Sequence, residues 1–232
     1  MIDVRPFDTL GGFQNGWLAA RHHFSFGAYR EAARMGFGPL CVWNDDEIAP
    51  GKGFDPHPHA DMEIVTYVRQ GAITHRDSLG NEGRTEAGDV QVMHAGTGVV
   101  HAEYNLEHET TRLFQIWIRP DRTGVAPGWA TRRFPRGSGV AVLASGRVDD
   151  AVSGALPLHA DAQLRAGVLR AGETLHLPLA TGRGCYLVPA TGSVTVNGIP
   201  IGPRDGAAIQ DEPELVITAT KQADLVAVEV AL

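Results

Sequence analysis

The chain carries the stretch Gly51-Lys-Gly-Phe-Asp-Pro-His57-Pro-His59-Ala-Asp-Met-Glu63, which places two histidines on alternate positions and a glutamate four positions after the second. Alternate residues of a β-strand point to the same face, so His57 and His59 can present two imidazoles to one side of a sheet. Prolines on both sides of His57 favour extended backbone and donate no hydrogen bonds to a neighbouring strand. We therefore expect this pair at the edge or rim of a sheet.

A second pair follows in the stretch Gly96-Thr-Gly-Val-Val-His101-Ala-Glu103, where one residue separates a histidine from a glutamate. Three segments between the two stretches are expected to be strands, at residues 63–68, 71–76 and 89–93. If that sheet closes into a barrel, both pairs point inward to one site. One His-x-His pair alone is weak evidence, whereas two such pairs are specific. Three imidazoles and one carboxylate suit a divalent transition metal, namely iron, copper, nickel, manganese or zinc.

Composition excludes several classes of protein. The chain has 232 residues, of which 20% are charged and 43% hydrophobic, as in globular domains. Its net charge of -7 gives no basic surface for direct nucleic-acid binding. We find no apolar run of membrane-spanning length and no secretory signal at the start, so we expect a cytoplasmic protein. Cys41 and Cys185 are expected to be reduced and buried.

The rhythm of the sequence predicts an all-β protein with two similar halves. Short runs of Val, Ile and Thr alternate with turns rich in Gly, Pro or Asn-Gly. Residues 120–139 collect prolines, glycines and four arginines, interpreted as a solvated linker surface: Arg122, Arg132, Arg133 and Arg136. We therefore predict domains at residues 1–130 and 131–232. The second half contains only His159 and His176 as histidines, and we expect it to hold no metal.

Several other polar residues have two interpretations. His22 and His23 stand beside phenylalanines, and packing of an N-terminal arm is favoured over a wall of the site. For His75, a hydrogen bond to the loop at Asp77 is favoured over a place in the cavity. His94 is the best candidate for a fifth polar group in the pocket, but metal binding by it is not favoured.

The segment before the first histidine pair is expected to be a strand that ends early. Residues 40–44 alternate as a strand does, and the polar run at residues 44–47 reads as a turn.

These motifs resemble the cupin superfamily. Its first motif is a glycine, five residues, His-x-His and then a glutamate, and its second ends in Gly-x-x-His-x-x-x-Asn. The matching residues are Gly51, His57, His59, Glu63, Gly98, His101 and Asn105. Within cupins the chain resembles a short bacterial pirin, through text such as Glu63-Ile-Val-Thr-Tyr and His75-Arg-Asp-Ser-Leu-Gly-Asn. The resemblance is dense over residues 22–120 and looser after that.

The resemblance implies a bicupin, in which two β-barrels pack face to face and only the N-terminal one binds metal. It places the metal ligands on His57, His59, His101 and Glu103. In most cupins the acid of the first motif, here Glu63, is a ligand. In pirins the acid after the third histidine takes that role. We therefore expect Glu63 near the metal, as a hydrogen-bonding neighbour of the ligands or as an alternative ligand.

Two departures from the pirin pattern lie close to these motifs. Many pirins have Arg-Gly-Phe-Glu where this chain has Ala60-Asp-Met-Glu63, and relatives often carry Ser or Thr where this chain has His94. Both changes alter the expected shape and polarity of the pocket. The resemblance therefore supports the metal site more strongly than any particular substrate.

The family resemblance implies iron(II), with copper, nickel, manganese or zinc as alternatives. Several pirins resemble quercetin 2,3-dioxygenases, which open a flavonol ring with dioxygen and release carbon monoxide. Glu103 or Glu63 would take the proton of the substrate hydroxyl. A different class of function is an iron-binding regulator that modulates a partner protein or transcription factor, and a third is a zinc-bound isomerase. The resemblance also implies a monomer.

Overall fold

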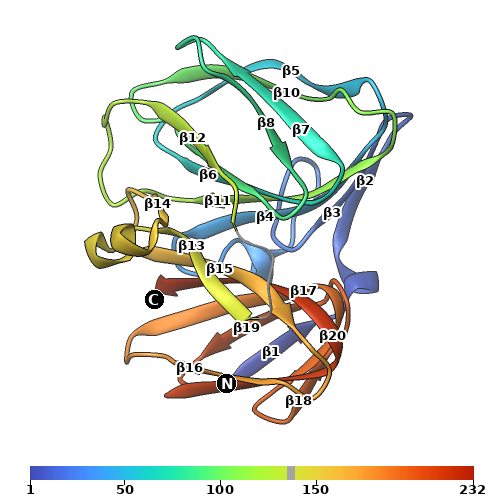
Figure 1. Ribbon diagram of the computed structural model, residues 1–232, viewed down its shortest axis with the longest axis vertical. Helices are drawn as coiled ribbons and strands as arrows, with labels where there is room; N and C mark the ends of the chain where they lie inside the picture. Colours follow the sequence, from blue (N-terminus) through green and yellow to red (C-terminus); the bar gives the residue numbers. More distant parts are fainter. Residues whose placement is uncertain (135–138) are drawn as a thin grey trace.

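The computed structural model describes residues 1–134 and 139–232 and is built almost entirely of β-strands in two stacked halves (Figure 1). In the N-terminal half, one sheet has seven strands. Their order is β12 (Gly128–Arg132), β9 (Val90–His94), β6 (Glu63–Gln70), β11 (Thr111–Ile118), β4 (Leu40–Ile48), β3 (Leu18–His22) and β2 (Gly11–Gln14). The facing sheet has four, in the order β5 (Lys52–His59), β10 (Val99–Asn105), β7 (Ala72–Asp77) and β8 (Glu82–Glu86).

The C-terminal half is formed by one large curved sheet. Its strands run in the order β1 (Ile2–Arg5), β19 (Gly206–Gln210), β17 (Arg183–Val196), β20 (Glu214–Ala231), β15 (Ala162–Leu169), β13 (Gly139–Ser145) and β14 (Leu156–Pro157). Two further strands join its sides, β16 (Thr174–Pro178) on β20 and β18 (Ile199–Ile201) on β17. The helical elements are short 3-10 turns, η1 (Phe7–Thr9), η2 (Ala32–Arg34) and η3 (Val148–Ser153).

The alternation of side chains along β6 explains how the halves fit together. Ile64 lines a cavity inside the N-terminal barrel. Its neighbour Val65 points the opposite way, into a buried cluster that also contains Tyr186 and Val228 of the C-terminal half. The strands β4, β6 and β11 of the seven-stranded sheet therefore separate the inside of the first barrel from the layer between the barrels. These features confirm the predicted all-β fold with two packed barrels.

The predicted domain boundary is not a clean break between sheets. It falls inside β12, which pairs with β9 of the N-terminal half. The first strand also crosses over, since β1 pairs with β19, with Ile2 opposite Ile209. Ile2 and Val4 pack against the apolar core of the C-terminal half, which is why this strand leaves its own half. The division at residues 130 and 131 stays a prediction.

Other expectations about the chain concern its surface and its cysteines. Arg133 is largely exposed and forms ion pairs with Glu86 and Asp89, in keeping with a solvated linker surface. Arg136 lies outside the described residues. Cys41 and Cys185 are buried free thiols. Among residues 1–134 and 139–232, no helix has the length and apolar character needed to cross a membrane.

The expected turn at residues 44–47 is wrong, because β4 continues to Ile48. Asp45 is fully buried, and each of its carboxylate oxygens is bound by an arginine, Arg69 on one side and Arg204 on the other. Arg204 also reaches Glu47 at 3.2 Å. These ion pairs neutralise the charges, so a polar run that resembles a turn is retained in a central strand.

Candidate metal centre

Three of the predicted ligands meet at the rim of the N-terminal barrel. His57 and His59 lie on β5, and His101 lies opposite His57 on the adjacent strand β10. Their potential ligand atoms all lie within 4.8 Å of one another, and the Nε2 atoms of His57 and His101 are 3.1 Å apart. Two nitrogens bound to one ion at usual distances and angles would be about 2.8–3.4 Å apart. This three-histidine group therefore has the spacing of a metal site.

The surroundings of the imidazoles leave their Nε2 atoms available. The Nδ1 of His57 donates to the backbone carbonyl of Asp55 at 2.7 Å, which fixes the tautomer with a free lone pair on Nε2. The Nε2 of His59 is buried and has no hydrogen-bond partner among the residues that the structure describes. An orphaned buried nitrogen is costly unless something binds it, and a metal ion would do so. The residues present thus fit a divalent metal.

The electrostatics of the three-histidine group favour the neutral imidazoles that metals require. Burial, with help from the neighbouring His101 and His57, lowers the pKa of His59 to about 4. Burial, followed by His57 and His75, lowers the pKa of His101 to about 3. Both rings are therefore unprotonated near neutral pH, and a metal does not compete with protons there.

Glu103 lies two residues after His101 on β10. The pairing of β10 with β5 shifts in register between these two residues. The carboxylate of Glu103 is almost fully buried and accepts hydrogen bonds from two side-chain amides, Gln115 at 2.8 Å and Gln91 at 2.5 Å. Both amides belong to the opposite sheet, so Glu103 spans the barrel. Potential ligand atoms of Glu103, His101 and His75 lie within 4.8 Å of one another. Glu103 does not lie this close to His57, His59 and His101 together.

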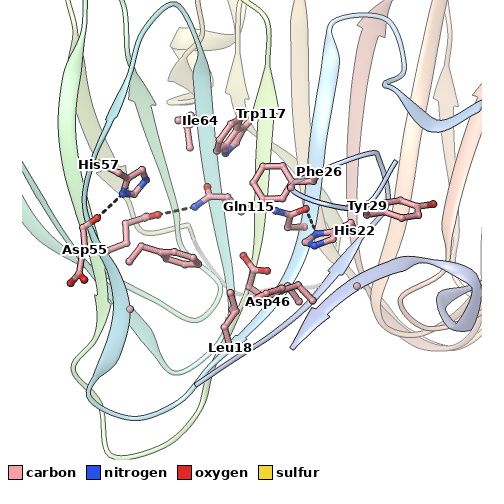
Figure 2. A pocket seen from close by; sticks show the side chains of 18 of the residues that line it. Leu18, His22, Phe26, Tyr29, Asp46, Asp55, His57, Ile64, Gln115 and Trp117 are labelled. Atoms are coloured by element: carbon pink, nitrogen blue, oxygen red, sulfur yellow. Dashed lines mark hydrogen bonds between the residues drawn. The ribbon is translucent and has the colours of Figure 1, made fainter. Parts of the chain in front are cut away.

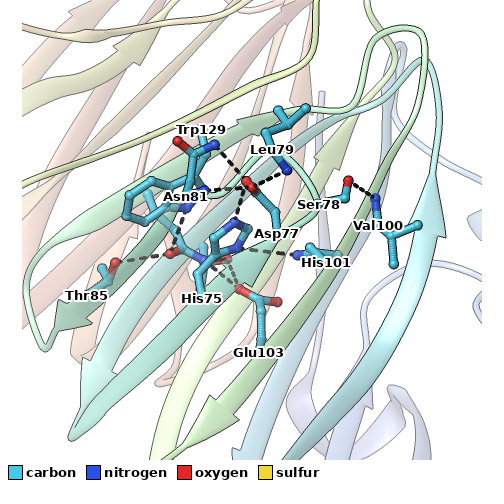
Figure 3. A network of polar contacts seen from close by, with 12 residues as sticks. His75, Asp77, Ser78, Leu79, Asn81, Thr85, Val100, His101, Glu103 and Trp129 are labelled. Atoms are coloured by element: carbon cyan, nitrogen blue, oxygen red, sulfur yellow. Dashed lines mark hydrogen bonds and ion pairs between the residues drawn. The ribbon is translucent and has the colours of Figure 1, made fainter.

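A chain of polar contacts continues behind His101 (Figure 3). The Nε2 of His75 lies 3.1 Å from Asp77, which confirms the favoured interpretation of that histidine. Its Nδ1 lies 3.4 Å from the Nδ1 of His101, and Trp129 stacks on its ring at 4.9 Å. Burial acts to raise the pKa of Asp77, but hydrogen bonds from Asn81 and His75 outweigh it and lower that pKa. The ionised Asp77 thus orients His75, which in turn orients His101.

The three-histidine group opens onto a large apolar cavity of about 620 Å³ (Figure 2). His57, His59, His101 and Glu103 line one side. Aromatic rings line much of the rest: Phe13, Trp17, Phe26, Tyr29, Phe54 and Trp117. A cavity of this size with a few polar groups is typical of a small-molecule site, and its rings favour a flat aromatic ligand.

Asp46 is a polar group of this cavity that the sequence did not single out. Because β4 continues through it, Asp46 points to the cavity while Asp45 points away. Burial, together with the charges of Asp45 and Glu103, raises the pKa of Asp46 to about 8. In the described part of the chain, its buried Oδ1 has no hydrogen-bond partner. Near neutral pH it is therefore a protonated acid that can donate a hydrogen bond to a ligand. The sequence contained an indication of this, because Asn44 and Asp46 are two residues apart and would point to the same face of a strand.

The two histidines of the N-terminal arm have different places. His22 lines the cavity, and its Nδ1 lies 2.8 Å from the side-chain oxygen of Asn44. Burial lowers its pKa, so it faces the cavity as a neutral ring. His23 is fully buried between Trp43 and Tyr186 and contacts the tyrosine hydroxyl at 2.9 Å. The predicted packing of the N-terminal arm is confirmed for His23, whereas His22 lines the wall of the cavity.

Glu63 was expected near the metal, as a hydrogen-bonding neighbour of the ligands or as an alternative ligand, but its carboxylate contacts other residues. Its neighbour Ile64 lines the cavity, so the alternation of β6 turns Glu63 toward the C-terminal half. There its carboxylate lies 2.6 Å from His94 and accepts the backbone N–H of His159 at 3.0 Å. His94, on the same face of the adjacent strand β9, is likewise outside the cavity. A spacing pattern could not reveal this, because the side of a strand depends on the sheet that covers it.

Comparison with known proteins agrees with this architecture. The family model for pirin matches residues 4–118, and that for the quercetinase C-terminal cupin domain matches residues 142–230. A pirin-like protein from Caulobacter vibrioides is 59% identical over 100% of both chains. Quercetin 2,3-dioxygenase from Escherichia coli K12 is 40% identical over 97% of this chain and 96% of its own.

Among solved structures, the bacterial pirin YhhW from Escherichia coli in complex with nickel(II) superimposes with a TM-score of 0.94. It is 39% identical, and the alignment covers 100% of this chain and 99% of that one. Family models cover both halves, and relatives match the whole length. The chain belongs to the pirin family.

Proposed function

We propose that this protein is a metal-dependent dioxygenase that opens the ring of a flavonol-like compound, with iron(II) as its metal. The observation that carries the proposal is the buried, unpartnered Nε2 of His59, which faces an apolar cavity beside two further imidazoles. The name of the relative from Escherichia coli and the nickel(II) in the solved pirin support a divalent metal and this reaction class.

We assign His57, His59, His101 and Glu103 as the metal ligands. The first three already have the spacing of a site. Glu103 lies beside His101, where Gln91 and Gln115 hold its carboxylate in one orientation. When bound, the metal would supply Lewis acidity and would mediate electron transfer from the substrate, which is the net reductant, to dioxygen.

Residues of the chain orient the substrate, hydrogen-bond to it and accept its proton. The aromatic walls, with Trp117 and Phe54 near the histidines, orient a flat ring and exclude water. Asp46, protonated near neutral pH, donates a hydrogen bond to a substrate oxygen. Glu103 is the carboxylate that can accept the substrate's hydroxyl proton, because the carboxylate of Glu63 is directed at His94 and His159.

Dioxygen uptake and carbon monoxide release test the proposal, measured with quercetin and iron(II)-loaded protein. Metal-free protein and the His101→Ala variant serve as comparisons. The matched control is His108→Ala, which changes an exposed histidine in the loop after β10. We expect turnover in the wild type and the control, and a loss of at least 100-fold in His101→Ala. Wild-type protein that binds iron without turnover would overturn the proposal and favour the regulatory function.

A further inference from the structure

A second cluster of metal-binding side chains lies between the two halves, on the face of the seven-stranded sheet opposite the cavity. Glu63 on β6 and His94 on β9 are directly opposite each other in the ladder. His159 comes from the C-terminal half, two residues after β14, which Figure 1 shows between the two halves. Potential ligand atoms of all three lie within 4.8 Å of one another.

Hydrogen bonds join the three residues of this interdomain cluster, but they do not engage every polar atom of the side chains. The Oε2 of Glu63 is engaged by the Nδ1 of His94 at 2.6 Å and by the backbone N–H of His159 at 3.0 Å. The Nδ1 of His159 is buried and has no hydrogen-bond partner within residues 1–134 and 139–232. It lies 3.6 Å from the Oε1 of Glu63, too far for a hydrogen bond.

The separation of Glu63 Oε1 and His159 Nδ1 suits a bound ion better than a hydrogen bond, whereas the 2.6 Å between Glu63 Oε2 and His94 Nδ1 is a hydrogen bond that an ion would replace. Two ligand atoms of a tetrahedral site with usual bond lengths are about 3.3–3.4 Å apart, close to the separation of Oε1 and His159 Nδ1. The rings of His94 and His159 have centroids 4.4 Å apart, so both can face one point. We propose that Glu63, His94 and His159 form a second metal site, which binds a divalent ion of the zinc type between the two halves.

The chemistry of these ligands defines the ion. Two imidazoles and one carboxylate leave a fourth tetrahedral position for water. The proton shared by His94 and Glu63 would leave to solvent as the ion binds. Glu63 is 1% exposed, whereas the side chain of His159 is 30% exposed and provides the route of entry. Because the ligands come from both halves, the ion would tie the halves together and need not take part in the reaction.

The stoichiometry of zinc binding tests the site. Metal-free protein is titrated with zinc by calorimetry, and bound zinc is counted by elemental analysis after gel filtration. We expect two ions per chain in the wild type and one in His94→Ala. Removal of the first site with His101→Ala also leaves one, and the double variant retains none. His159→Ala, at the more exposed ligand, should give the same count as His94→Ala without a large loss of packing.

Thermal unfolding in the His101→Ala background isolates the second site. Zinc at about 100 times its Kd should raise Tm by about 5 °C or more, and His94→Ala should abolish the rise. The matched control is His176→Ala, since His176 pairs with Glu214 at 3.2 Å on the surface and belongs to no group of three candidate ligands among the described residues. It should leave both readouts unchanged. One zinc per wild-type chain, or two that persist in both His94→Ala and His159→Ala, would overturn the proposal.

Discussion

At the scale of single residues, the chemistry of the cavity depends on groups that fix other groups. Glu103 is held from across the barrel by the amides of Gln91 and Gln115, and His101 is held from behind by His75. Ligands that are held in place before the ion arrives lose little freedom on binding. The supporting residues are therefore as informative to mutate as the ligands.

Substitution of Gln115 by leucine should weaken metal binding without removing a ligand. The variant loses the hydrogen bond to Glu103 at 2.8 Å, and such supporting contacts contribute about 10- to 100-fold in affinity. Iron(II) or nickel(II) titration of metal-free protein measures the change. Gln163→Leu removes a comparably buried amide in the C-terminal half and should leave the affinity as it is. Unchanged affinity in Gln115→Leu would argue against Glu103 as a ligand.

The raised pKa of Asp46 predicts how stability depends on pH. Between its unfolded pKa near 3.8 and its folded pKa of about 8, unfolding releases a proton from Asp46, so rising pH favours the unfolded state. The stabilisation is complete below pH 3.8 and is lost as pH rises to 8. Asp46→Asn removes this term. The free energy of unfolding of the variant relative to wild type should therefore increase by about 1 kcal/mol per pH unit.

Urea denaturation of metal-free wild type and Asp46→Asn at pH 6, 7 and 8 checks this trend. Because both proteins share every other titrating group, the difference isolates Asp46. A difference that stays constant over this range would mean that Asp46 is already ionised in the folded protein.

Individual residues differ in how far the sequence can place them. His57, His59 and His101 were predicted to converge because period-two spacing on neighbouring strands is a local property. Glu63 obeys the same spacing but faces the other half, because packing between barrels decides which side of β6 is the inside. Asp46 escaped notice because its strand was mistaken for a turn.

At the scale of strands, the metal site depends on how closely β5 approaches β10. Gly53 makes that approach possible, since a Cβ at this position would lie 2.2 Å from the carbonyl oxygen of Glu103. No side chain fits at that distance without separation of the two strands. The register that sets His57 opposite His101 thus depends on Gly53, which has no side chain with which to bind a metal or a substrate.

Gly53→Ala should therefore both destabilise the protein and loosen the site. Relief of the clash moves β5, at a cost of about 1–3 kcal/mol in the free energy of unfolding, and weakens metal binding. Gly16→Ala is the matched control, because a Cβ there meets nothing within 4 Å. Denaturant unfolding and metal titration of both variants measure the effect. Equal behaviour of the two variants would show that β5 adapts freely.

Most strands were predictable because their apolar residues alternate or form short runs between turns. The expected segments at residues 63–68, 71–76 and 89–93 correspond to β6, β7 and β9. The end of β4 was not predictable, because its charged residues are neutralised by Arg204 from a distant part of the sequence. Local strand propensity contains no information about a partner that only the tertiary fold brings near.

At the scale of the whole molecule, the two halves are joined by an apolar layer and by the ion pair between Asp45 and Arg204, and Asp45 is also paired with Arg69 of its own half. Asp45→Ala should destabilise the protein by about 3–5 kcal/mol, because Arg69 would remain buried without its counter-charge. Chemical denaturation gives the value. Glu82→Ala breaks the exposed pair with Arg76 and should change stability by less than about 1 kcal/mol. A small effect of Asp45→Ala would show that water reaches this layer.

The division into two halves was evident from the repeated strand-and-turn rhythm, because each half forms its own strands. Which faces meet, and which segments cross between halves, depends on long-range packing that the rhythm does not encode. The cluster of Glu63, His94 and His159 is an example, since its members come from motifs and segments far apart in the sequence.

The crossing of β1 has a consequence for synthesis of the chain. Residues 2–5 are synthesised about 200 residues before their partners at residues 206–209, as the pairing of Ile2 with Ile209 requires. The N-terminal barrel can close while translation continues, whereas β1 must wait as an unpaired strand. Exposed strand edges pair readily with other chains. Nascent copies on neighbouring ribosomes would therefore be prone to join through residues 2–5.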